Sequence, residues 1–144
     1  MKNSLEPYEI TGGCLCRNIR YRITEHPLMC AICYCRQCQH SSGSEATQVL
    51  VVPRTQFKVI KGEPKKYKSK GGSGFSVIRC FCGECGSPLF ALPEGNRDLV
   101  SVKICSLDDP AAFKPNVAIF IREAQPWTST PEKIHLFQQS LQIP

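Results

Sequence analysis

The sequence predicts a small all-β protein that is clipped together by zinc and has a short helix near its C-terminus. Three observations predict this fold: apolar and polar residues alternate in short segments, glycine- and proline-containing turns separate these segments, and closely spaced cysteines recur along the chain. The 144 residues show no internal repeat, low-complexity tract or linker. We therefore expect a single zinc-binding domain over residues 1–144.

The first clear strand lies between Ile19 and Ile23, where apolar residues alternate with two arginines. Residues 57–60 and 66–68 flank a Gly-Glu-Pro turn and predict a β-hairpin. The other expected strands span residues 49–52, 75–81, 88–92, 99–104 and 117–121.

Two helical segments are expected near the C-terminus. One is a capped turn over residues 108–113. The other is a helix capped by Ser129 or Thr130, with Pro131 at its first position. Three apolar residues would then share one helix face: Ile134, Phe137 and Leu141.

The composition indicates where the protein works. No apolar run reaches the roughly 18 residues of a membrane span, and residues 1–7 lack the apolar core of a signal peptide. We therefore expect a cytoplasmic protein with no membrane partner. Ten cysteines in a reducing compartment indicate metal binding or catalysis rather than disulfides. Their short spacings agree, because a disulfide between cysteines one or two residues apart is strained.

Four cysteines lie in two glycine-flanked pairs, Cys14-Leu-Cys16 and Cys82-Gly-Glu-Cys85. Glycine lets the backbone turn tightly and direct its N–H groups at sulfur. Two such pairs form a closed tetrahedral Cys₄ site, which is typical of structural zinc. This site would tie the N-terminal strand to a central hairpin and stabilise the fold directly.

Three further cysteines, Cys33, Cys35 and Cys38, lie within six residues. Three thiolates on one short loop can hold a zinc ion and leave its fourth position for water or substrate, as in catalytic zinc sites. A site of this kind carries a net charge of −1 and suits exchange of a sulfur ligand, since thiolates are soft ligands. Arg36 either offsets this charge or faces solvent.

Spacing alone leaves another pairing open. Cys30-Ala-Ile-Cys33 could join Cys82 and Cys85 in a zinc ribbon and leave the first pair unused. Otherwise we expect the three cysteines in apolar stretches to be unreactive core residues: Cys30, Cys80 and Cys105.

No spacing among His26, His40 and His135 makes a site, although His40 could reach a substrate if it does not simply face solvent. The serines of residues 41–44 could donate hydrogen bonds to an anionic ligand or form a surface loop.

The formal charge is +6, and five lysines lie between Lys61 and Lys70. They suit either a solvated strand edge or attraction of an anionic partner. Two Zn²⁺ would add four positive charges and seven thiolates seven negative ones, which lowers the net charge to about +3. This modest charge, and the lack of aromatic residues near the lysines beyond Tyr67, argue against a nucleic-acid partner.

Several motifs of the chain occur together in one known family. In chain order they are Gly12-Gly13-Cys14-Leu15-Cys16, Ile19-Arg20-Tyr21, Cys33-Tyr34-Cys35-Arg36-Gln37-Cys38, Ser42-Gly43-Ser44, Phe81-Cys82-Gly83-Glu84-Cys85-Gly86-Ser87-Pro88-Leu89-Phe90 and Pro126-Trp127. The sequence resembles the glutathione-dependent formaldehyde-activating enzymes, a family that includes centromere protein V. The resemblance implies the β-tent fold. It also implies structural zinc on Cys14, Cys16, Cys82 and Cys85, and catalytic zinc on Cys33, Cys35 and Cys38.

Two residues depart from the family pattern. Tyr34 stands where histidine is common, and Arg17 stands where glycine is usual. Neither is a zinc ligand, so we expect them to affect the substrate more than metal binding.

The resemblance and the cysteine spacing together predict a zinc-dependent carbon–sulfur lyase or synthase with two Zn²⁺ per chain. It would act on a thiol adduct such as S-hydroxymethylglutathione, formed from glutathione and formaldehyde. The metal would bind the thiol as thiolate or polarise the aldehyde, and the sequence contains no evident general base. The alternatives are a non-enzymatic zinc-stabilised binding module of the centromere protein V type and a cysteine-pair redox protein. No sequence feature indicates an oligomeric state.

Overall fold

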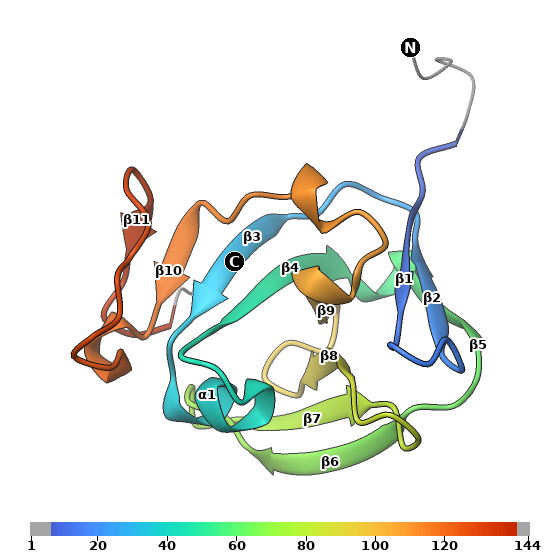
Figure 1. Ribbon diagram of the computed structural model, residues 1–144, viewed down its shortest axis with the longest axis horizontal. Coiled ribbons are helices and arrows are strands. Elements are labelled where there is room, and N and C mark those ends of the chain that lie inside the picture. Colours follow the sequence, from blue (N-terminus) through green and yellow to red (C-terminus); the bar gives the residue numbers. More distant parts are fainter. Residues whose placement is uncertain (1–6, 141–144) are drawn as a thin grey trace.

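The chain folds into two β-sheets and one α-helix (Figure 1). The computed structural model describes residues 7–140. The prediction about a signal peptide falls mainly on residues 1–6, outside the described residues. The all-β class predicted from the sequence is confirmed. Within residues 7–140 no helix is long and apolar enough to span a membrane.

A three-stranded antiparallel sheet has the order β1-β2-β5. Its strands are β1 (Ile10–Gly13), β2 (Arg20–Ile23) and β5 (Phe57–Lys61). The alternation in β2 has the predicted consequence, because Tyr21 and Ile23 are fully buried while Arg20 and Arg22 are only partly buried.

The larger sheet has eight strands in the order β11-β10-β3-β4-β9-β8-β7-β6. In chain order they are β3 (Met29–Cys33), β4 (Thr47–Pro53), β6 (Lys65–Lys70), β7 (Ser76–Phe81), β8 (Pro88–Pro93), β9 (Leu99–Lys103), β10 (Val117–Ile119) and β11 (His135–Leu136). Strand β10 pairs in parallel with β3 and β11, and the other pairs are antiparallel.

The main core is shared by the two sheets. Apolar side chains of β1 and β2 pack with those of β4, β8 and β9, and the most deeply buried include Leu50, Leu89, Val100 and Val102. Each Leu or Val side chain buried in this way contributes about 1.5–3 kcal/mol to stability.

The predicted hairpin over residues 57–68 is wrong, although both of its strands form. β5 pairs with β2 and β6 pairs with β7, so the Gly-Glu-Pro segment carries the chain from one sheet to the other. Gly62 has a φ of 75°, and a side chain there would collide with the carbonyl oxygen of Asn18. Strand β6 forms an edge of the large sheet, and its four lysines are exposed, as expected for a solvated edge.

The C-terminal helix is also a wrong prediction. Residues 129–140 contain no helix, and β11 instead pairs in parallel with β10. Lys133 has a φ of 61°, a left-handed conformation that interrupts a right-handed helix after the Pro131 start. Leu141, the last residue of the proposed apolar face, lies outside the described residues.

The α-helix of residues 7–140 is α1 (Arg36–Ser42), which the strand-dominated pattern did not predict. The sulfur of Cys35 caps it by accepting a hydrogen bond from the Cys38 N–H, and Gly43 ends it with a φ of 66°. The curved large sheet places β3 and β4 on one side of α1 and β7 on the other (Figure 1). Single 3₁₀ turns cover Arg54–Gln56, Ile104–Ser106, Pro110–Ala112 and Ile121–Glu123, the third of them within the expected turn 108–113.

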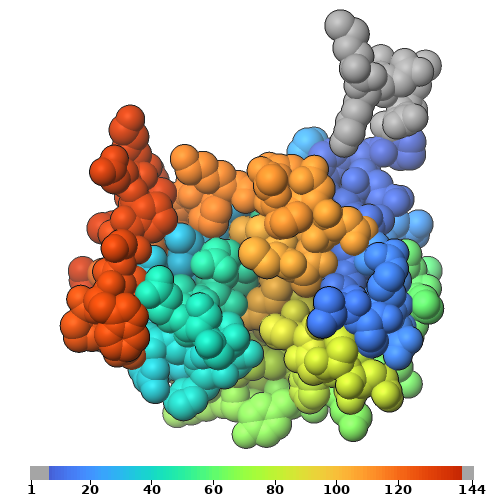
Figure 2. All heavy atoms as spheres, in the orientation of Figure 1, coloured from blue at the N-terminus to red at the C-terminus, as the bar shows by residue number. Residues whose placement is uncertain are grey.

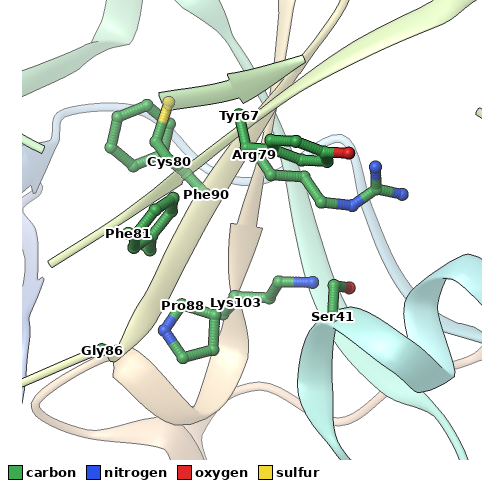
Figure 3. A pocket seen from close by; sticks show the side chains of 9 residues that line it. All are labelled: Ser41, Tyr67, Arg79, Cys80, Phe81, Gly86, Pro88, Phe90 and Lys103. Atoms are coloured by element: carbon green, nitrogen blue, oxygen red, sulfur yellow. The ribbon is translucent and has the colours of Figure 1, made fainter. Parts of the chain in front are cut away.

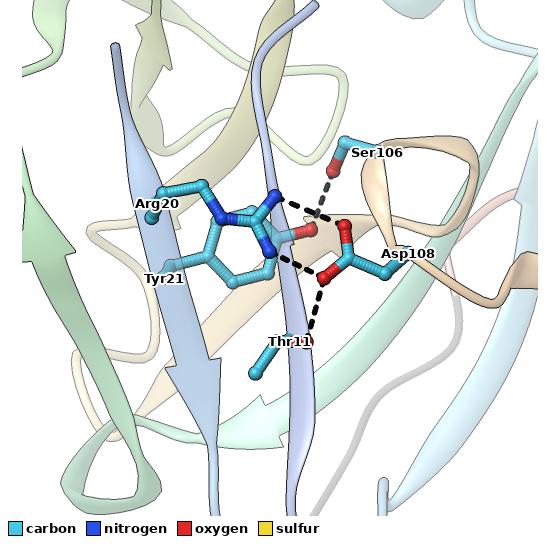
Figure 4. A network of polar contacts seen from close by, with 5 residues as sticks. All are labelled: Thr11, Arg20, Tyr21, Ser106 and Asp108. Carbon is cyan, nitrogen blue, oxygen red and sulfur yellow. Dashed lines mark hydrogen bonds and ion pairs between the residues drawn. The ribbon is translucent and has the colours of Figure 1, made fainter. Parts of the chain in front are cut away.

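A polar network joins the small sheet to the turn after β9 (Figure 4). The hydroxyls of Tyr21 and Ser106 lie 2.6 Å apart, and Arg20 forms a two-pronged ion pair with Asp108. The Thr11 hydroxyl donates to the same carboxylate at 2.6 Å. Hydrogen bonds from Arg20 and then from Thr11 lower the pKa of Asp108 from 3.8 to about 2.

This network predicts a pH-dependent contribution to stability. Because the pKa of Asp108 is lower in the folded state, the unfolded state binds its proton first as the pH falls. We expect Asp108→Asn to lower the free energy of unfolding by about 0.5–1 kcal/mol at neutral pH, since water screens this half-exposed pair.

The difference between wild type and Asp108→Asn should shrink as the pH falls from about 4 to about 2. Urea unfolding of both proteins across this pH range measures the difference in their free energies of unfolding. Protonation of the thiolate metal ligands at low pH affects both proteins equally, so it cancels in this difference. A difference that does not depend on pH would contradict the assignment.

Candidate metal centres

The structure brings Cys14, Cys16, Cys82 and Cys85 together, with all four Sγ atoms within 4.8 Å of one another. The first pair lies in the turn after β1 and the second in the turn between β7 and β8. The sulfurs of Cys14 and Cys16 are 3.5 Å apart, and those of Cys16 and Cys82 are 3.7 Å apart. Four thiols in such a cluster could hold one tetrahedral metal ion and leave no position open.

Both turns direct hydrogen-bond donors at sulfur. The Ile19 N–H donates to Cys14 Sγ at 3.2 Å, and the Glu84 N–H donates to Cys82 Sγ at 3.4 Å. The hydrogen bond with the Ser87 hydroxyl lowers the pKa of Cys85 to about 5. These donors stabilise thiolates, the form in which cysteine binds metal.

Arg17 lies in the first of these turns. Its φ of 64° is left-handed, a conformation that costs a residue with a side chain about 1–2 kcal/mol relative to glycine. This explains why glycine suits the position. It also places this departure from the family pattern beside the four-thiol cluster.

The second cluster, the three-thiol site, consists of Cys33, Cys35 and Cys38, whose Sγ atoms also lie within 4.8 Å of one another. Cys33 ends β3, Cys35 caps α1 and Cys38 lies in the first turn of the helix. Strand end and helix start therefore converge on one point, which lets three residues so close in sequence face a common ion. Cys33 and Cys35 are buried, whereas Cys38 is partly exposed.

The three thiols do not titrate independently. Hydrogen bonds from Cys33 and Cys38 lower the pKa of Cys35 to about 2, and the same contacts raise the pKa of Cys33. One thiolate is thus favoured while the other two keep their protons. A cation is needed to hold all three as thiolates.

Phe120 and a glycine turn enclose one side of the three-thiol site. Phe120 packs against Cys33 and Cys35 and is itself buried. A Cβ added to Gly72 would lie 3.1 Å from the Phe120 ring and 3.6 Å from Cys35 Cβ. The turn of residues 71–74 can therefore cover the site closely because it has no side chain at this point.

A cavity of about 280 Å³ lies beside this site (Figure 3). It runs from Gly86, next to Cys85, to Ser41 on α1, and Arg79 and Lys103 line it. The Ser41 hydroxyl donates to the Cys38 carbonyl at 3.3 Å, and Arg79 donates to Gln37 Oε1 at 3.2 Å. The polar ends of Ser41 and Arg79 thus contact α1, which contains Cys38 and is capped by Cys35.

Neither cation was identified by the sequence analysis. Arg79 lies between apolar residues of β7, and Lys103 ends the apolar strand β9. A lone cation in an apolar strand is a weak signal on its own. Both residues reach the site only through pairing of the central strands, which no local pattern reveals.

The other candidate cysteines lie outside both thiol clusters. Cys30, Cys80 and Cys105 belong to neither cluster, so the structure does not form the alternative zinc ribbon with Cys30. Cys80 is buried in the core and also lines the first cavity (Figure 3), whereas Cys105 is exposed, contrary to the expected core position. Tyr34 packs in a small apolar cluster with Ile32, Ala46 and Ala118 and does not line the first cavity.

The histidines also lie outside both clusters. His26 stacks on Tyr8, and His135 is exposed on β11. His40 contacts Arg36 and lines a second, open cavity of about 650 Å³ between α1 and Trp127, where the helix borders the C-terminal segment (Figure 2). Of the residues 41–44, Ser41 lines the first cavity and Ser44 the second.

Comparison with known proteins assigns the chain to a family. The family model described as glutathione-dependent formaldehyde-activating enzyme matches residues 9–123. The crystal structure of a Rhodobacter sphaeroides protein matches with a TM-score of 0.54 and 17% sequence identity. That match covers 68% of this chain and 87% of the other, and it shows a likeness of fold. None of the curated proteins compared with the chain matches it. Because the family model spans most of the sequence and both thiol clusters, the chain belongs to the family of glutathione-dependent formaldehyde-activating enzymes.

Proposed function

We propose that the protein is a zinc-dependent carbon–sulfur lyase or synthase that acts on a thiol adduct such as S-hydroxymethylglutathione. It would work in the cytoplasm as a single domain over residues 1–144 with two Zn²⁺ per chain. Its substrate would be a small thiol, and glutathione is the candidate that the family suggests. In this proposal Cys14, Cys16, Cys82 and Cys85 hold structural zinc, and Cys33, Cys35 and Cys38 hold catalytic zinc.

One observation carries the proposal: the second cluster has three thiols, not four, within 4.8 Å of one another. A cavity lined by Ser41, which contacts Cys38, lies beside α1, although none of the three thiols lines it. A four-thiol site satisfies a tetrahedral ion completely, whereas a three-thiol site leaves one position for a reactant. The cavity supplies the space that the reactant needs, and Phe120 covers another side of the site. The two clusters thus differ in the feature that separates structural from catalytic zinc.

The residues around the site have separable roles in the reaction. When bound, zinc supplies Lewis acidity and a soft centre for sulfur. Cys33, Cys35 and Cys38 hold the metal, and the backbone N–H of Cys38 stabilises the sulfur of Cys35. Phe120 and the turn at Gly72 keep water from one side. Thiol and aldehyde held together in the cavity would react faster than in solution, because the entropic cost of their encounter is met on binding.

Exchange NMR tests the activity. Glutathione and formaldehyde interconvert with S-hydroxymethylglutathione without a catalyst, so the uncatalysed exchange rate must be subtracted. We expect the metal-loaded protein to increase the exchange rate in proportion to its concentration. Cys30→Ser, a change at a partly buried cysteine outside both clusters, should leave that increase intact.

The cobalt-substituted protein provides a second measurement. Thiol binding at the three-thiol site should shift its visible absorption bands, because these bands depend on ligand type and geometry. A shift without faster exchange would indicate a different thiol adduct as substrate. If no thiol shifts the bands or changes the exchange rate, the lyase proposal is wrong.

A further inference from the structure

Charge limits what the three-thiol site can bind. Three thiolates and one Zn²⁺ carry a net charge of −1, and a fourth thiolate would make it −2. Cys33 and Cys35 are buried, and Phe120 packs against them, so little water is available on that side to stabilise the extra charge. A buried charge without compensation is costly. Binding a substrate as thiolate therefore requires positive charge nearby.

Two cations lie beside the site, and neither is neutralised by a carboxylate. The Lys103 ammonium donates to Thr47 Oγ1 at 3.0 Å, and Thr47 lies opposite Cys33 in the β3–β4 pairing. Arg79 donates to Ser69 Oγ at 2.6 Å and to Gln37 Oε1 at 3.2 Å. Across residues 7–140, the ion pairs are Arg20–Asp108 and Lys68–Glu94, so these two cations are paired with neutral groups only.

Lys103 interacts electrostatically with the site itself. Burial lowers the pKa of Lys103, and the like charge of Arg79 lowers it further. Cys38, and more weakly Cys33 and Cys35, act in the opposite direction. Lys103 therefore lies close enough to the three-thiol site to stabilise negative charge there, above all at Cys38. Figure 3 shows the polar ends of Lys103 and Arg79 on the same side of the cavity as Ser41.

We infer that Lys103 and Arg79 are the counter-cations of the three-thiol site, and that they set its fourth position to bind sulfur as an anionic thiolate. This inference rests on the proposed function and deepens it. With both cations the metal-loaded site carries +1, and one thiolate brings it to zero. The incoming thiol would lose its proton to solvent and bind as thiolate, and a metal held by Cys33, Cys35 and Cys38 would supply the soft Lewis acid that favours sulfur. Lys103 and Arg79 act through this charge balance and are positioning residues.

The cations could instead bind a carboxylate of the substrate, and the choice of probe separates the two cases. 2-Mercaptoethanol has no carboxylate, whereas 3-mercaptopropionate is a thiol of similar size that has one. Counter-cations stabilise the bound sulfur and therefore increase the affinity for both thiols. A pair of cations that binds the carboxylate would increase the affinity for 3-mercaptopropionate only.

The test is titration of the cobalt-substituted protein with 2-mercaptoethanol, followed by its visible absorption. We expect Lys103→Met to weaken binding of this thiol on the order of tenfold, because the lost charge acts in a poorly hydrated site. Lys103→Arg should restore most of the affinity. Lys66→Met, which removes an exposed lysine of β6, is the matched control and should bind as wild type does. All variants should keep the cobalt of the three-thiol site, which separates loss of thiolate binding from loss of metal.

Two results would overturn the inference while leaving the proposed function standing. One is equal affinity of wild type and Lys103→Met for 2-mercaptoethanol. The other is a Lys103→Met protein that binds 3-mercaptopropionate more weakly than wild type does but binds 2-mercaptoethanol equally well. That result would show that Lys103 and Arg79 bind the carboxylate of the thiol. If Lys103→Met loses metal or folds poorly, Arg79→Gln takes its place under the same criteria. A wild-type protein that binds neither thiol would overturn the proposed function, and this inference with it.

Discussion

Cys82→Ser is expected to leave the protein unfolded or insoluble. Cys82 is almost fully buried in the main core and belongs to the four-thiol cluster. A structural zinc site contributes about 10–16 kcal/mol in zinc-finger peptides, which is as large as the whole net stability of a typical domain, about 5–15 kcal/mol. The cluster also joins cysteines 66 residues apart, Cys16 and Cys82, so the small sheet would lose its tie to the β7–β8 turn.

Cys80→Ser provides the matched control for this substitution. Cys80 is as buried as Cys82 and lies two residues away on β7, but it belongs to neither cluster. The substitution should lower the free energy of unfolding by about 1–3 kcal/mol, because it buries a hydroxyl, and should leave two metal ions per chain. Soluble yield, circular dichroism and native mass spectrometry measure both effects. A folded Cys82→Ser protein that keeps two metals would contradict the structural role.

Cys35→Ser is expected to remain folded, to bind one metal ion instead of two, and to lose the catalysed exchange. Serine is a preferred helix cap, so its hydroxyl can replace the sulfur that accepts the Cys38 N–H at the start of α1. The local fold is therefore preserved while one of three metal ligands is removed. Two thiolates bind zinc too weakly to keep the site filled.

Native mass spectrometry gives the metal count for Cys35→Ser, and exchange NMR gives its activity. Cys30→Ser on β3 is the control, because it changes a cysteine near the three-thiol site that is not part of it. Unfolding of Cys35→Ser together with a folded Cys82→Ser would reverse the two assignments. Retention of both metals and of activity would remove Cys35 from the site.

The sequence predicted the elements whose signal is local. Alternation in β2, the apolar run in β4 and the turns around β7 and β8 all led to strands that the structure contains. The cysteine groups could be proposed for the same reason, since residues two or three apart share a turn wherever the chain goes. Pairing of Cys14 and Cys16 with Cys82 and Cys85 needed the family resemblance as well. Spacing alone also allowed a zinc ribbon in which Cys30 and Cys33 join the second pair.

The failures are non-local in origin. Residues 57–68 have the pattern of a hairpin, yet the close approach of Gly62 to Asn18 directs the two strands into different sheets. Residues 129–140 have a helix start, yet Lys133 is left-handed and His135–Leu136 pair with β10 as a short strand. In both cases contacts with a distant segment outweigh a local preference that is worth only a few tenths of a kcal/mol per residue.

By itself the sequence determined the all-β class, three groups of closely spaced thiols and the resemblance to the family, because composition, alternation and spacing are properties of short stretches. Only the tertiary structure decided which thiols meet and what surrounds them. Lys103 and Arg79 lie 65 and 41 residues beyond Cys38 and reach the three-thiol site because β7, β8, β9 and β4 pair side by side. Charge interactions act through space, so their partners are set by strand order, which no local pattern encodes.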